Sequence, residues 1–409
     1  MLKRIGVGNL RIGMHIHELC GSWMDHPFWR TRFILDDAED IRRLRESGIT
    51  EVWIDTALGL DVLQAEPRAT ARTEAEVAAE VDQALAQVDM QGATQGPVAT
   101  TEELARAVRI CARGKSAVVS MFNEARMGKA ISTTAADALV DEISNSVMRN
   151  PGALISLARL KTADDYTYLH SVAVSALMVA LARQLGLDAA TTRELGKAGL
   201  LHDLGKAKTP IEILNKPGKL TDEEFAVIKR HPEDGHGILV AGAASGEIPL
   251  DVVLHHHEKM DGAGYPRRFK GDEISLYARM GAVCDVYDAI TSNRPYKDGW
   301  DPADAIRKMA EWCGGHFDSR VFQAFVKCIG IYPIGSLVRL ASGRLGVVVE
   351  QSGGSLLTPC VKVFFSTRSQ SHIPPEVIDL SLPAAKDKIV SREDASRWGL
   401  KNIERFWVP

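Results

Sequence analysis

Cysteine is scarce in this sequence and is not arranged in pairs. The 409 residues contain six cysteines, at positions 20, 111, 284, 313, 328 and 360, and no CxxC motif. This spacing argues against a disulfide framework and predicts reduced thiols in a cytoplasmic protein. The N-terminus MLKRIGVGNLRIGMHIHE lacks the apolar core of a signal peptide, and no stretch reaches the roughly 18 apolar residues that a transmembrane helix needs. We therefore predict a cytoplasmic protein that does not enter a membrane.

An excess of positive charge is also missing. Lys and Arg number 49 against 53 Asp and Glu, which gives a formal net charge of −4. A chain with this balance has no basic field to attract nucleic acid polymers or anionic membranes. Any anionic substrate must therefore be captured by a local cluster of cations or by a metal ion. The composition is otherwise that of a globular protein, and the length allows two or three domains.

Hydrophobic periodicity divides the chain into segments of different character. Residues 1–65 predict a small mixed α/β domain, because RIGMHIHEL and TEVWID read as strands and DDAEDIRRLRESGI has the apolar spacing of a helix. Residues 66–150 are polar and alanine-rich at first and then helical. They predict a helical linker or a dimerisation segment, with a helical bundle as an open alternative.

The remaining residues fall into a helical part, 151–330, and a β-rich part, 331–409. DPADAIRKMAEWCGG has Asp301 at the N-cap and Pro302 at the first helical position, and TDEEFAVIKRH predicts a capped helix that ends at His231. GSLVRLASGRLGVVVEQ and PCVKVFFS alternate as antiparallel strands do. The predicted fold class is mainly α: a helical bundle with a small mixed α/β N-terminal domain and a small β-rich C-terminal unit.

Histidines are concentrated in the helical part. Seven of the 12 lie between positions 170 and 257. A His-Asp pair such as the one in LLHDLGKAKTP carries little information alone. However, several predicted apolar helices in this part each contain a His or an Asp. A further apolar helix, SLYARMGAVCDVYDAITS, contains Asp285 and Asp288. Charges inside apolar helices are costly unless they are paired or coordinated. The pattern predicts a metal site inside the bundle, against the alternative of separate capping and surface roles.

The donor types narrow the choice of metal. Imidazoles with carboxylates and no thiolate suit Fe, Mn, Ni, Co or Zn in an open site, whereas structural zinc more often uses cysteine. A carboxylate such as Asp203 can bridge two ions, and a pair of ions about 3.5–4 Å apart is an arrangement that cleaves phosphoesters.

Two basic loops follow the last histidines. HHHEKMDGAGYPRRFKGDEIS contains Tyr265 among arginines and lysines, and TSNRPYKDGW contains Arg294 and Lys297 beside another tyrosine. Taken alone, each loop reads as a solvated turn. Next to a metal site, both become candidates for binding a phosphate or a base.

These motifs together resemble the HD-GYP family, the cyclic di-GMP phosphodiesterase subgroup of the HD superfamily. The matching pieces are HDLGK, HHHEKMDGAGYP, VCDVYDAITSNRPYK and GGHFDSRVFQAF, in the order and at about the spacing of the family. The resemblance covers about 150–330. The N-terminal segment is also similar to a small domain often found ahead of HD-GYP domains, which implies nothing about its function.

The resemblance implies a role for each matching residue. Asp203 bridges the metals, Lys206 contacts the scissile phosphate, Arg294 and Lys297 hold substrate phosphate, and Tyr265 belongs to the GYP loop. His255 is an extra histidine outside the pattern, while Phe317 and Asp318 are structural. The implied metal ligands are His170, His202, Asp203, His231, His256, His257 and Asp285.

The chain departs from the family at one position. Some members place a glutamate four residues before the first histidine ligand, where it supports a third metal, but this sequence has Tyr166 there. A phenol is a poor ligand near neutral pH. Asp164 or Asp165 could reach the site only from a non-helical start. We therefore expect two transition-metal ions, with Fe or Mn favoured and Ni, Co or Zn open, and a third ion left as an alternative.

The implied activity is metal-dependent hydrolysis of cyclic di-GMP to linear pGpG, and to GMP after a second turnover, in bacterial second-messenger signalling. Asp203 and Lys206 would be the catalytic residues. Two alternatives stay open: a cyclic di-GMP receptor or protein-interaction module with little turnover, and an HD-type phosphohydrolase acting on another nucleotide. A homodimer or a signalling-protein partner would bind through the N-terminal region.

Overall fold

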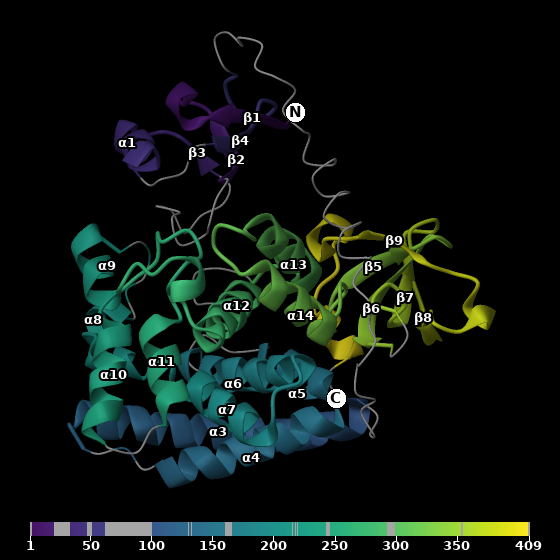
Figure 1. The fold of residues 1–409 in the computed structure, drawn as a ribbon. Coiled ribbons are helices and arrows are strands. Elements are labelled where there is room, and N and C mark those ends of the chain that lie inside the picture. Colours follow the sequence, from purple (N-terminus) through teal and green to yellow (C-terminus); the bar gives the residue numbers. More distant parts are fainter. Residues whose placement is uncertain are drawn as a thin grey trace. The chain divides into compact units, whose positions relative to one another are not determined.

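The computed structural model describes residues 2–19, 33–46, 51–61, 100–129, 131, 133–159, 166–214, 216, 218, 220–242, 246–292, 299–352 and 355–407. These residues form a small N-terminal unit and a larger, mainly helical unit, which are treated separately here (Figure 1). Among the described residues, no helix combines the length and the apolar character needed to cross a bilayer.

The N-terminal unit is an antiparallel sheet with one helix. The strands lie in the order β1-β4-β2-β3, and alternation along β4 buries Val52 and Ile54. The core also contains Ile16, Leu35 and Leu44, each fully buried. The predicted mixed α/β character is confirmed, although β1 was not predicted. The elements are β1 (Leu2–Gly6), β2 (His15–Leu19), β3 (Phe33–Ile34), α1 (Ala38–Glu46) and β4 (Glu51–Asp55).

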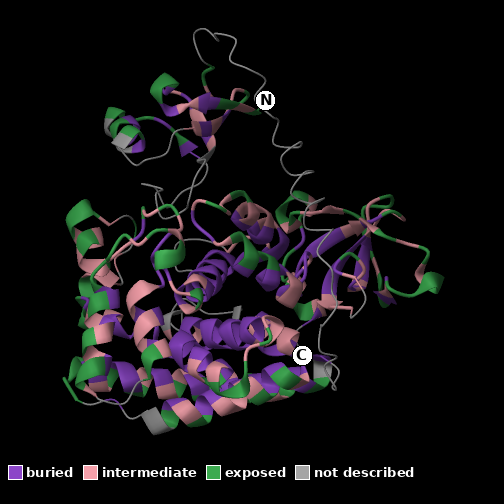
Figure 2. Ribbon diagram, viewed as in Figure 1, coloured by how far each residue is buried: buried purple, intermediate pink, exposed green. Residues whose placement is uncertain are grey.

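The first helices described in the helical unit share one hydrophobic core. Helix α6 contains the run SVAVSALMVALA, which is buried on every side (Figure 2). Helices α3 and α4 lie in the segment that we assigned to a linker, yet Phe122 and Val140 share one core with Val172 and Val179 of α6. These two helices are therefore part of the helical unit. The elements are α3 (Thr100–Arg126), α4 (Thr133–Arg149), α5 (Pro151–Arg159), α6 (Tyr166–Gln184) and α7 (Ala189–Leu201).

The second half of the helical unit has well-capped helices. Ser275, Asp301 and Asp318 cap α12, α13 and α14 by accepting hydrogen bonds from backbone amides of the first turn. One boundary was predicted wrongly, because α9 ends at Ile228 and His231 begins α10. Pro232 explains this break, since proline stops an incoming helix but fits a first turn. The elements are α8 (Ile211–Leu214), α9 (Asp222–Ile228), α10 (His231–Ala241), α11 (Glu247–His255), α12 (Leu276–Thr291), α13 (Pro302–Glu311) and α14 (Ser319–Ile329).

The C-terminal residues form an antiparallel sheet in the order β8-β7-β6-β5-β9, which confirms the predicted β character. Strand β8 was not predicted, and it contains Pro374 and Pro375. It lies at an edge of the sheet, where proline is tolerated. Arg392 of β9 joins the sheet to α13 through the Ala303 carbonyl at 3.5 Å and the Asp304 carboxylate at 3.7 Å. The elements are β5 (Leu337–Leu340), β6 (Arg344–Glu350), β7 (Cys360–Ser366), β8 (Ser371–Asp379) and β9 (Ile389–Arg392).

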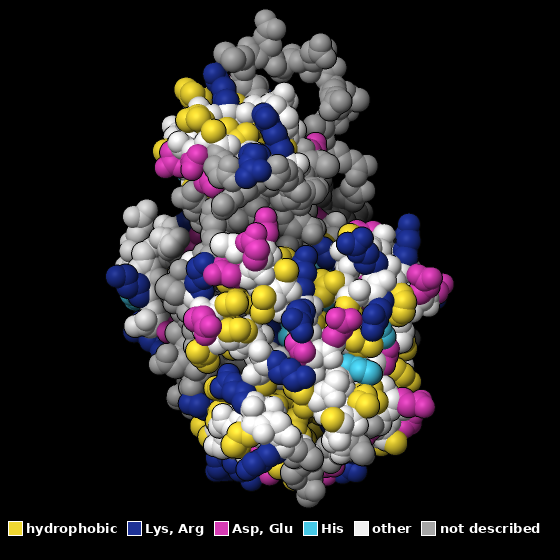
Figure 3. Space-filling model, turned by 90° about the vertical axis from the view of Figure 1, so that its left-hand side faces the viewer, with side chains coloured by type: hydrophobic (Ala, Val, Ile, Leu, Met, Phe, Trp, Pro, Cys, Tyr) yellow, Lys and Arg dark blue, Asp and Glu magenta, His cyan; other side chains and the backbone are white. Residues whose placement is uncertain are grey.

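The surface carries charges of both signs. Over the face that Figure 3 presents, lysines and arginines are interspersed with acidic side chains. This mixture agrees with the formal net charge of −4.

Candidate metal centre

Five helices bring the seven predicted ligands to one place inside the helical unit. Helix α6 carries the first histidine, α7 ends at the His-Asp pair, α10 begins with a histidine, α11 is followed by two more, and α12 carries the aspartate. All seven side chains belong to buried residues. The cluster comprises His170, His202, Asp203, His231, His256, His257 and Asp285.

One side of the cluster, which we call the first half-site, consists of His170, His202 and Asp285. The Nε2 atoms of the two histidines lie 3.2 Å apart, and His170 Nε2 lies 3.0 Å from Asp285 Oδ1. Two donors bound to one ion at about 2.1 Å are separated by about 3.0–3.4 Å at ordinary coordination angles. The spacing of the first half-site therefore fits a single transition-metal ion.

The second half-site consists of His231, His256 and His257. His231 Nε2 lies 3.2 Å from His256 Nε2 and 3.3 Å from Asp203 Oδ1. The other oxygen of Asp203, Oδ2, lies 3.4 Å from His202 Nε2 in the first half-site. The Asp203 carboxylate therefore faces both half-sites with different oxygens, as a carboxylate shared by two ions would.

Backbone carbonyls fix the orientation of three of the rings. The Nδ1 groups of His202, His231 and His256 donate to the carbonyls of Gly199 (2.8 Å), Ile228 (2.8 Å) and Val252 (3.0 Å). Each carbonyl lies three or four residues earlier in the chain, at the end of a helix or turn. With Nδ1 protonated, each Nε2 presents a lone pair to the cluster, which is the tautomer that a metal requires.

A carboxylate orients the fourth ring. His170 Nδ1 donates to Asp288 Oδ2 at 2.6 Å, and both groups are buried. Asp288 lies three residues after Asp285, on the same face of α12. In the sequence, Asp288 stands out only as a charge in an apolar helix. That buried charge, placed one helical turn from a predicted ligand, was the signal that could have identified it.

His257 has a buried nitrogen that lacks a partner. Its Nδ1 makes no hydrogen bond within the described part of the chain, and the closest carboxylate oxygen, Asp285 Oδ2, is 3.9 Å away. A buried polar atom without a partner costs roughly 1–3 kcal/mol. Coordination of a cation would satisfy it, so the donor set fits a metal.

Burial favours neutral imidazoles in the second half-site, where all three histidine pKa values are lowered. It lowers the pKa of His231 to about 3 and that of His256 to about 4, and it also holds the pKa of His257 well below its usual range. At His202 burial also opposes protonation, but the Asp203 and Asp285 carboxylates outweigh it and raise the pKa of that ring. Burial opposes ionisation of Asp203, but the charges of Lys206 and His202 outweigh it and keep the pKa of Asp203 well below normal. Neutral imidazoles and ionised carboxylates are the forms that bind metals.

Lys206 reaches into the cluster from the short 3-10 helix Leu204–Lys208. Its Nζ donates to Asp203 Oδ2 at 2.6 Å. Glycine is required at position 205, because a Cβ there would collide with the carbonyl oxygen of His231 and with the amide of Gly235. This contact fixes the His-Asp turn against the start of α10, and so links the two half-sites.

The GYP loop packs against the second half-site. Glu258 accepts hydrogen bonds from the amides of Arg267 (2.6 Å), Arg268 (3.1 Å) and Phe269 (3.1 Å). The Tyr265 ring stacks on His257 with centroids 4.7 Å apart. Burial raises the pKa of the Tyr265 phenol well above its usual range, so this hydroxyl stays protonated.

Gly264 has no room for a side chain, because a Cβ there would collide with backbone atoms of Glu258 and Lys259. The glycine of the GYP motif therefore permits the loop to fold back on the histidine pair. Glu258 and Gly264 position the loop, a role that sequence analysis did not assign to them.

The remaining residues named in the sequence analysis are either outside the described part of the chain or outside the cluster. Arg294 and Lys297, and also Asp164 and Asp165, lie outside the described residues, so their predicted roles stay predictions. His255 points away from the cluster and pairs with Asp251 at 2.9 Å, in keeping with its place outside the family pattern. The two residues that we expected to be structural are so: Phe317 is buried and Asp318 caps α14.

Comparisons with known proteins cover both units. Residues 143–321 match the family described as "HD domain", and residues 2–136 match one described as "Domain of unknown function (DUF3391)". The "Cyclic di-GMP phosphodiesterase PA4108" of Pseudomonas aeruginosa is 57% identical over 100% of this chain and 96% of its own length.

Two other relatives match over a shorter region. The "Cyclic di-GMP phosphodiesterase response regulator RpfG" of Xanthomonas campestris is 42% identical over 36% of this chain and 39% of its own length. The "3'3'-cGAMP-specific phosphodiesterase 1" of Vibrio cholerae is 39% identical over 40% of this chain and 38% of its own length. The chain is a member of the HD-GYP family of HD domain proteins, and within it a DUF3391 domain precedes the HD domain.

Proposed function

We infer that this chain is a metal-dependent phosphodiesterase that hydrolyses cyclic di-GMP to linear pGpG. The observation that carries this inference is the Asp203 carboxylate, whose two oxygens face two histidine half-sites. The surrounding chain is 57% identical, over its full length, to a protein named as a cyclic di-GMP phosphodiesterase. Paired sites of this kind are used to cleave phosphoesters.

The two half-sites divide the ligands between two ions. His170, His202 and Asp285 would hold one, and the second half-site would hold the other, with Asp203 shared. When bound, such ions lower the pKa of water and neutralise charge on the phosphoryl oxygens. We retain two ions as the proposed number and Fe or Mn as the proposed identity.

Among the described residues, Lys206 is a cation well placed to help the reaction. Its Nζ lies against the shared carboxylate, and its side chain is 23% exposed, so it can meet a substrate that approaches the cluster. There it would bind a phosphoryl oxygen and stabilise the charge that develops during hydrolysis. In the overall reaction water adds to phosphorus, the bond from phosphorus to the 3′ oxygen breaks, and that oxygen takes up a proton.

Purified full-length protein, reconstituted with Mn or Fe, tests the proposal directly. Cyclic di-GMP should be converted to pGpG, and prior treatment with a chelator should abolish the conversion until metal is restored. Chromatography of the products would follow the reaction. Binding of cyclic di-GMP without turnover under any metal condition would instead support a receptor.

A second cyclic dinucleotide, 3′3′-cGAMP, is an alternative candidate substrate. A relative named as specific for 3′3′-cGAMP is 39% identical over 40% of this chain. We propose cyclic di-GMP because the relative that aligns over the whole chain carries that name. Parallel assays with both cyclic dinucleotides decide between them, and a higher kcat/KM for 3′3′-cGAMP would reverse the assignment.

A further inference from the structure

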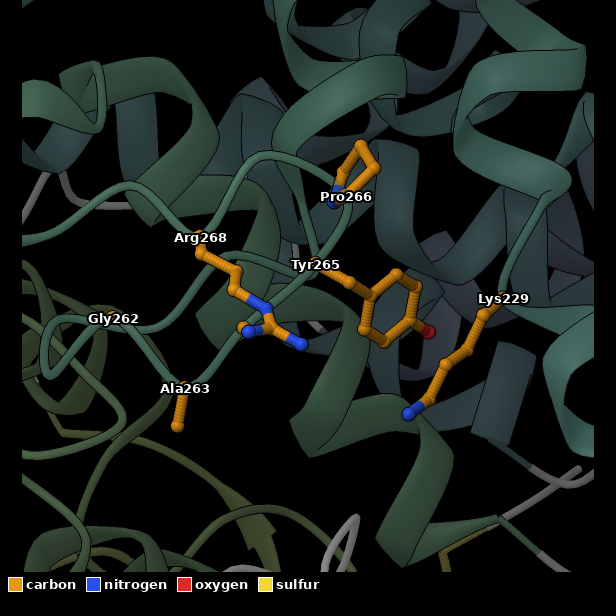
Figure 4. A pocket seen from close by; sticks show the side chains of 7 residues that line it. Lys229, Gly262, Ala263, Tyr265, Pro266 and Arg268 are labelled. Carbon is orange, nitrogen blue, oxygen red and sulfur yellow. The ribbon is translucent and has the colours of Figure 1, made fainter. Parts of the chain in front are cut away.

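A pocket of about 440 Å³ opens beside the second half-site. Tyr265 forms part of its wall, and the same ring stacks on His257, so the pocket adjoins the metal centre. Figure 4 shows the Tyr265 ring between Lys229, which comes from the end of α9, and Arg268 of the GYP loop. The lining residues are Lys229, Gly262, Ala263, Gly264, Tyr265, Pro266 and Arg268.

The charged groups of this pocket are hydrogen-bond donors only. Lys229 Nζ lies 5.6 Å from the centroid of the Tyr265 ring. The Arg268 guanidinium is exposed and has no acidic partner among the residues that the structure describes. The adjacent Arg267 differs, because it pairs with Glu233 at 3.4 Å and does not line the pocket.

The backbone of Arg268 is held in an unusual conformation. Its φ is 57°, in the left-handed region that residues with a side chain rarely adopt. Glu258 maintains this conformation by accepting hydrogen bonds from the backbone amides of Arg267 and Arg268. Glycine would adopt the same φ without strain, so the presence of an arginine here indicates a task for its side chain.

We propose that this pocket binds one guanine base of the cyclic dinucleotide and that Arg268 selects guanine over adenine. Guanine presents two acceptors, N7 and O6, to which arginine can donate two hydrogen bonds, whereas adenine places an amino group at the second position. This proposal rests on the proposed function, since a substrate phosphate at the half-sites brings a base within reach of the pocket.

The walls of the pocket favour a base over the second phosphate of the substrate. A phosphate is also an acceptor-only group, and Lys229 with Arg268 could bind one. However, an aromatic ring contributes stacking energy of roughly 1–3 kcal/mol to a base and nothing comparable to a phosphate. The Tyr265 ring provides flat apolar surface between the two cations, and Pro266 adds apolar surface to the wall (Figure 4).

The test uses metal-loaded, full-length protein with cyclic di-GMP and cyclic di-AMP as substrates. Arg268→Gly removes the side chain and relieves the backbone strain, so the loop should fold. We expect kcat/KM for cyclic di-GMP to fall about 10- to 100-fold, because one bidentate base contact is lost, while cyclic di-AMP changes little. Arg268→Lys should not restore the preference, because an ammonium lacks the planar fork. Lys229→Met should weaken both substrates by a smaller factor.

Arg267→Ala is the matched control, and it should leave the preference between the two substrates unchanged. An equal loss of kcat/KM for both substrates in Arg268→Gly would mean that Arg268 contacts phosphate. No loss of kcat/KM for either substrate would likewise overturn guanine selection. Calorimetric measurement of the binding of both ligands separates the proposed guanine pocket from the proposed phosphodiesterase function. Arg268-dependent preference in binding, without cleavage of any cyclic dinucleotide, would leave the pocket assignment standing and overturn the phosphodiesterase function.

Discussion

Two regions of the helical unit bury carboxylates, and they do so in opposite ways. Near the start of α3, Glu103 is fully buried, and its two oxygens accept hydrogen bonds from Arg149 (2.7 and 2.8 Å), Ser146 (2.7 Å) and Arg106 (3.1 Å). In the metal centre, the carboxylates face imidazole nitrogens at 3.0–3.5 Å, and the Nδ1 of His257 has no partner among the described residues.

This difference separates a structural ion cluster from a ligand site. The Glu103 network contains enough donors to satisfy its charge, so it is complete within the protein. The candidate metal centre gathers acceptor atoms around a common point, and Lys206 is its one hydrogen-bonded cation among the described residues. A bound metal ion would satisfy the atoms left over, such as His257 Nδ1. The contrast can be tested by removing single groups from each region.

The largest effect should follow from the shared carboxylate. Asp203→Asn removes a proposed ligand of both half-sites, so we expect the metal content to fall towards zero and the hydrolysis rate to fall by about 1000-fold or more. Elemental analysis of the purified protein and product chromatography measure the two quantities. Asp251→Asn is the control, because Asp251 pairs with His255 outside the cluster. Retention of both metals in Asp203→Asn would show that this carboxylate is not shared.

A smaller effect on metal content should follow from His257→Ala. This change removes one proposed ligand of the second half-site and leaves the first intact, so about half of the bound metal should be lost. The neighbouring His255→Ala serves as its control and should keep the full metal content. Titration of the apoprotein with Mn, followed by calorimetry, distinguishes one remaining site from two. Loss of both metals would mean that the half-sites fill only together.

Asp288→Asn should weaken the metal centre without removing a ligand. The carboxylate of Asp288 fixes the tautomer of His170, and loss of such a partner costs about 10- to 100-fold in metal affinity. Competition with a chelator of known affinity measures this change independently of turnover. Asp288→Glu, which keeps the charge, should recover part of the affinity. An unchanged affinity in Asp288→Asn would reduce Asp288 to a packing role.

The smallest effect should follow from removing the charge of Glu103, whose hydrogen-bond network is complete within the protein. Burial opposes ionisation of Glu103, but the hydrogen bonds from Arg149 and Ser146 outweigh it and lower its pKa below the usual value of 4.5. Stabilisation from such a group is present above pH 4.5 and is lost as the pH falls through the lowered pKa. Glu103→Gln should therefore reduce the free energy of unfolding by about 1–3 kcal/mol at neutral pH, and the difference from wild type should shrink in acid.

Urea unfolding at several pH values measures this difference. Glu102→Gln is the control, because Glu102 forms an exposed pair with Arg106 and should change stability by less than about 1 kcal/mol. If the loss of unfolding free energy in Glu103→Gln stays constant from neutral pH to acid, the charge of Glu103 does not contribute to stability. Metal content should be unchanged in both variants.

Sequence analysis succeeded where the signal repeats. The helical part, the β-rich tail and the mixed N-terminal unit each follow from periodicity, and histidines on several apolar helices predicted a shared site. The convergence of all seven side chains could be expected from the motifs, because a buried histidine or aspartate needs a partner. The roles of these residues as metal ligands remain proposals.

Features that depend on contacts between distant segments could not be predicted from the sequence. The sequence leaves the segment of α3 and α4 open between a linker and a bundle, because an amphipathic helix looks the same in both. Its packing on α6 is visible only in the structure. The position of His231 at the start of α10 was missed because Pro232 was not considered. The hydrogen bonds to Glu258 involve backbone amides nine to eleven residues away, which residue types do not reveal.

The proline pair of β8 has a consequence for how this protein meets other molecules. Pro374 and Pro375 lie in the outer strand of the C-terminal sheet, at a point where the pairing register with β7 shifts. Proline has no amide hydrogen, and an irregular edge cannot template another strand. This edge is thus protected against growth of the sheet from one molecule to the next, which favours solubility at high concentration in a protein that carries an open five-stranded sheet.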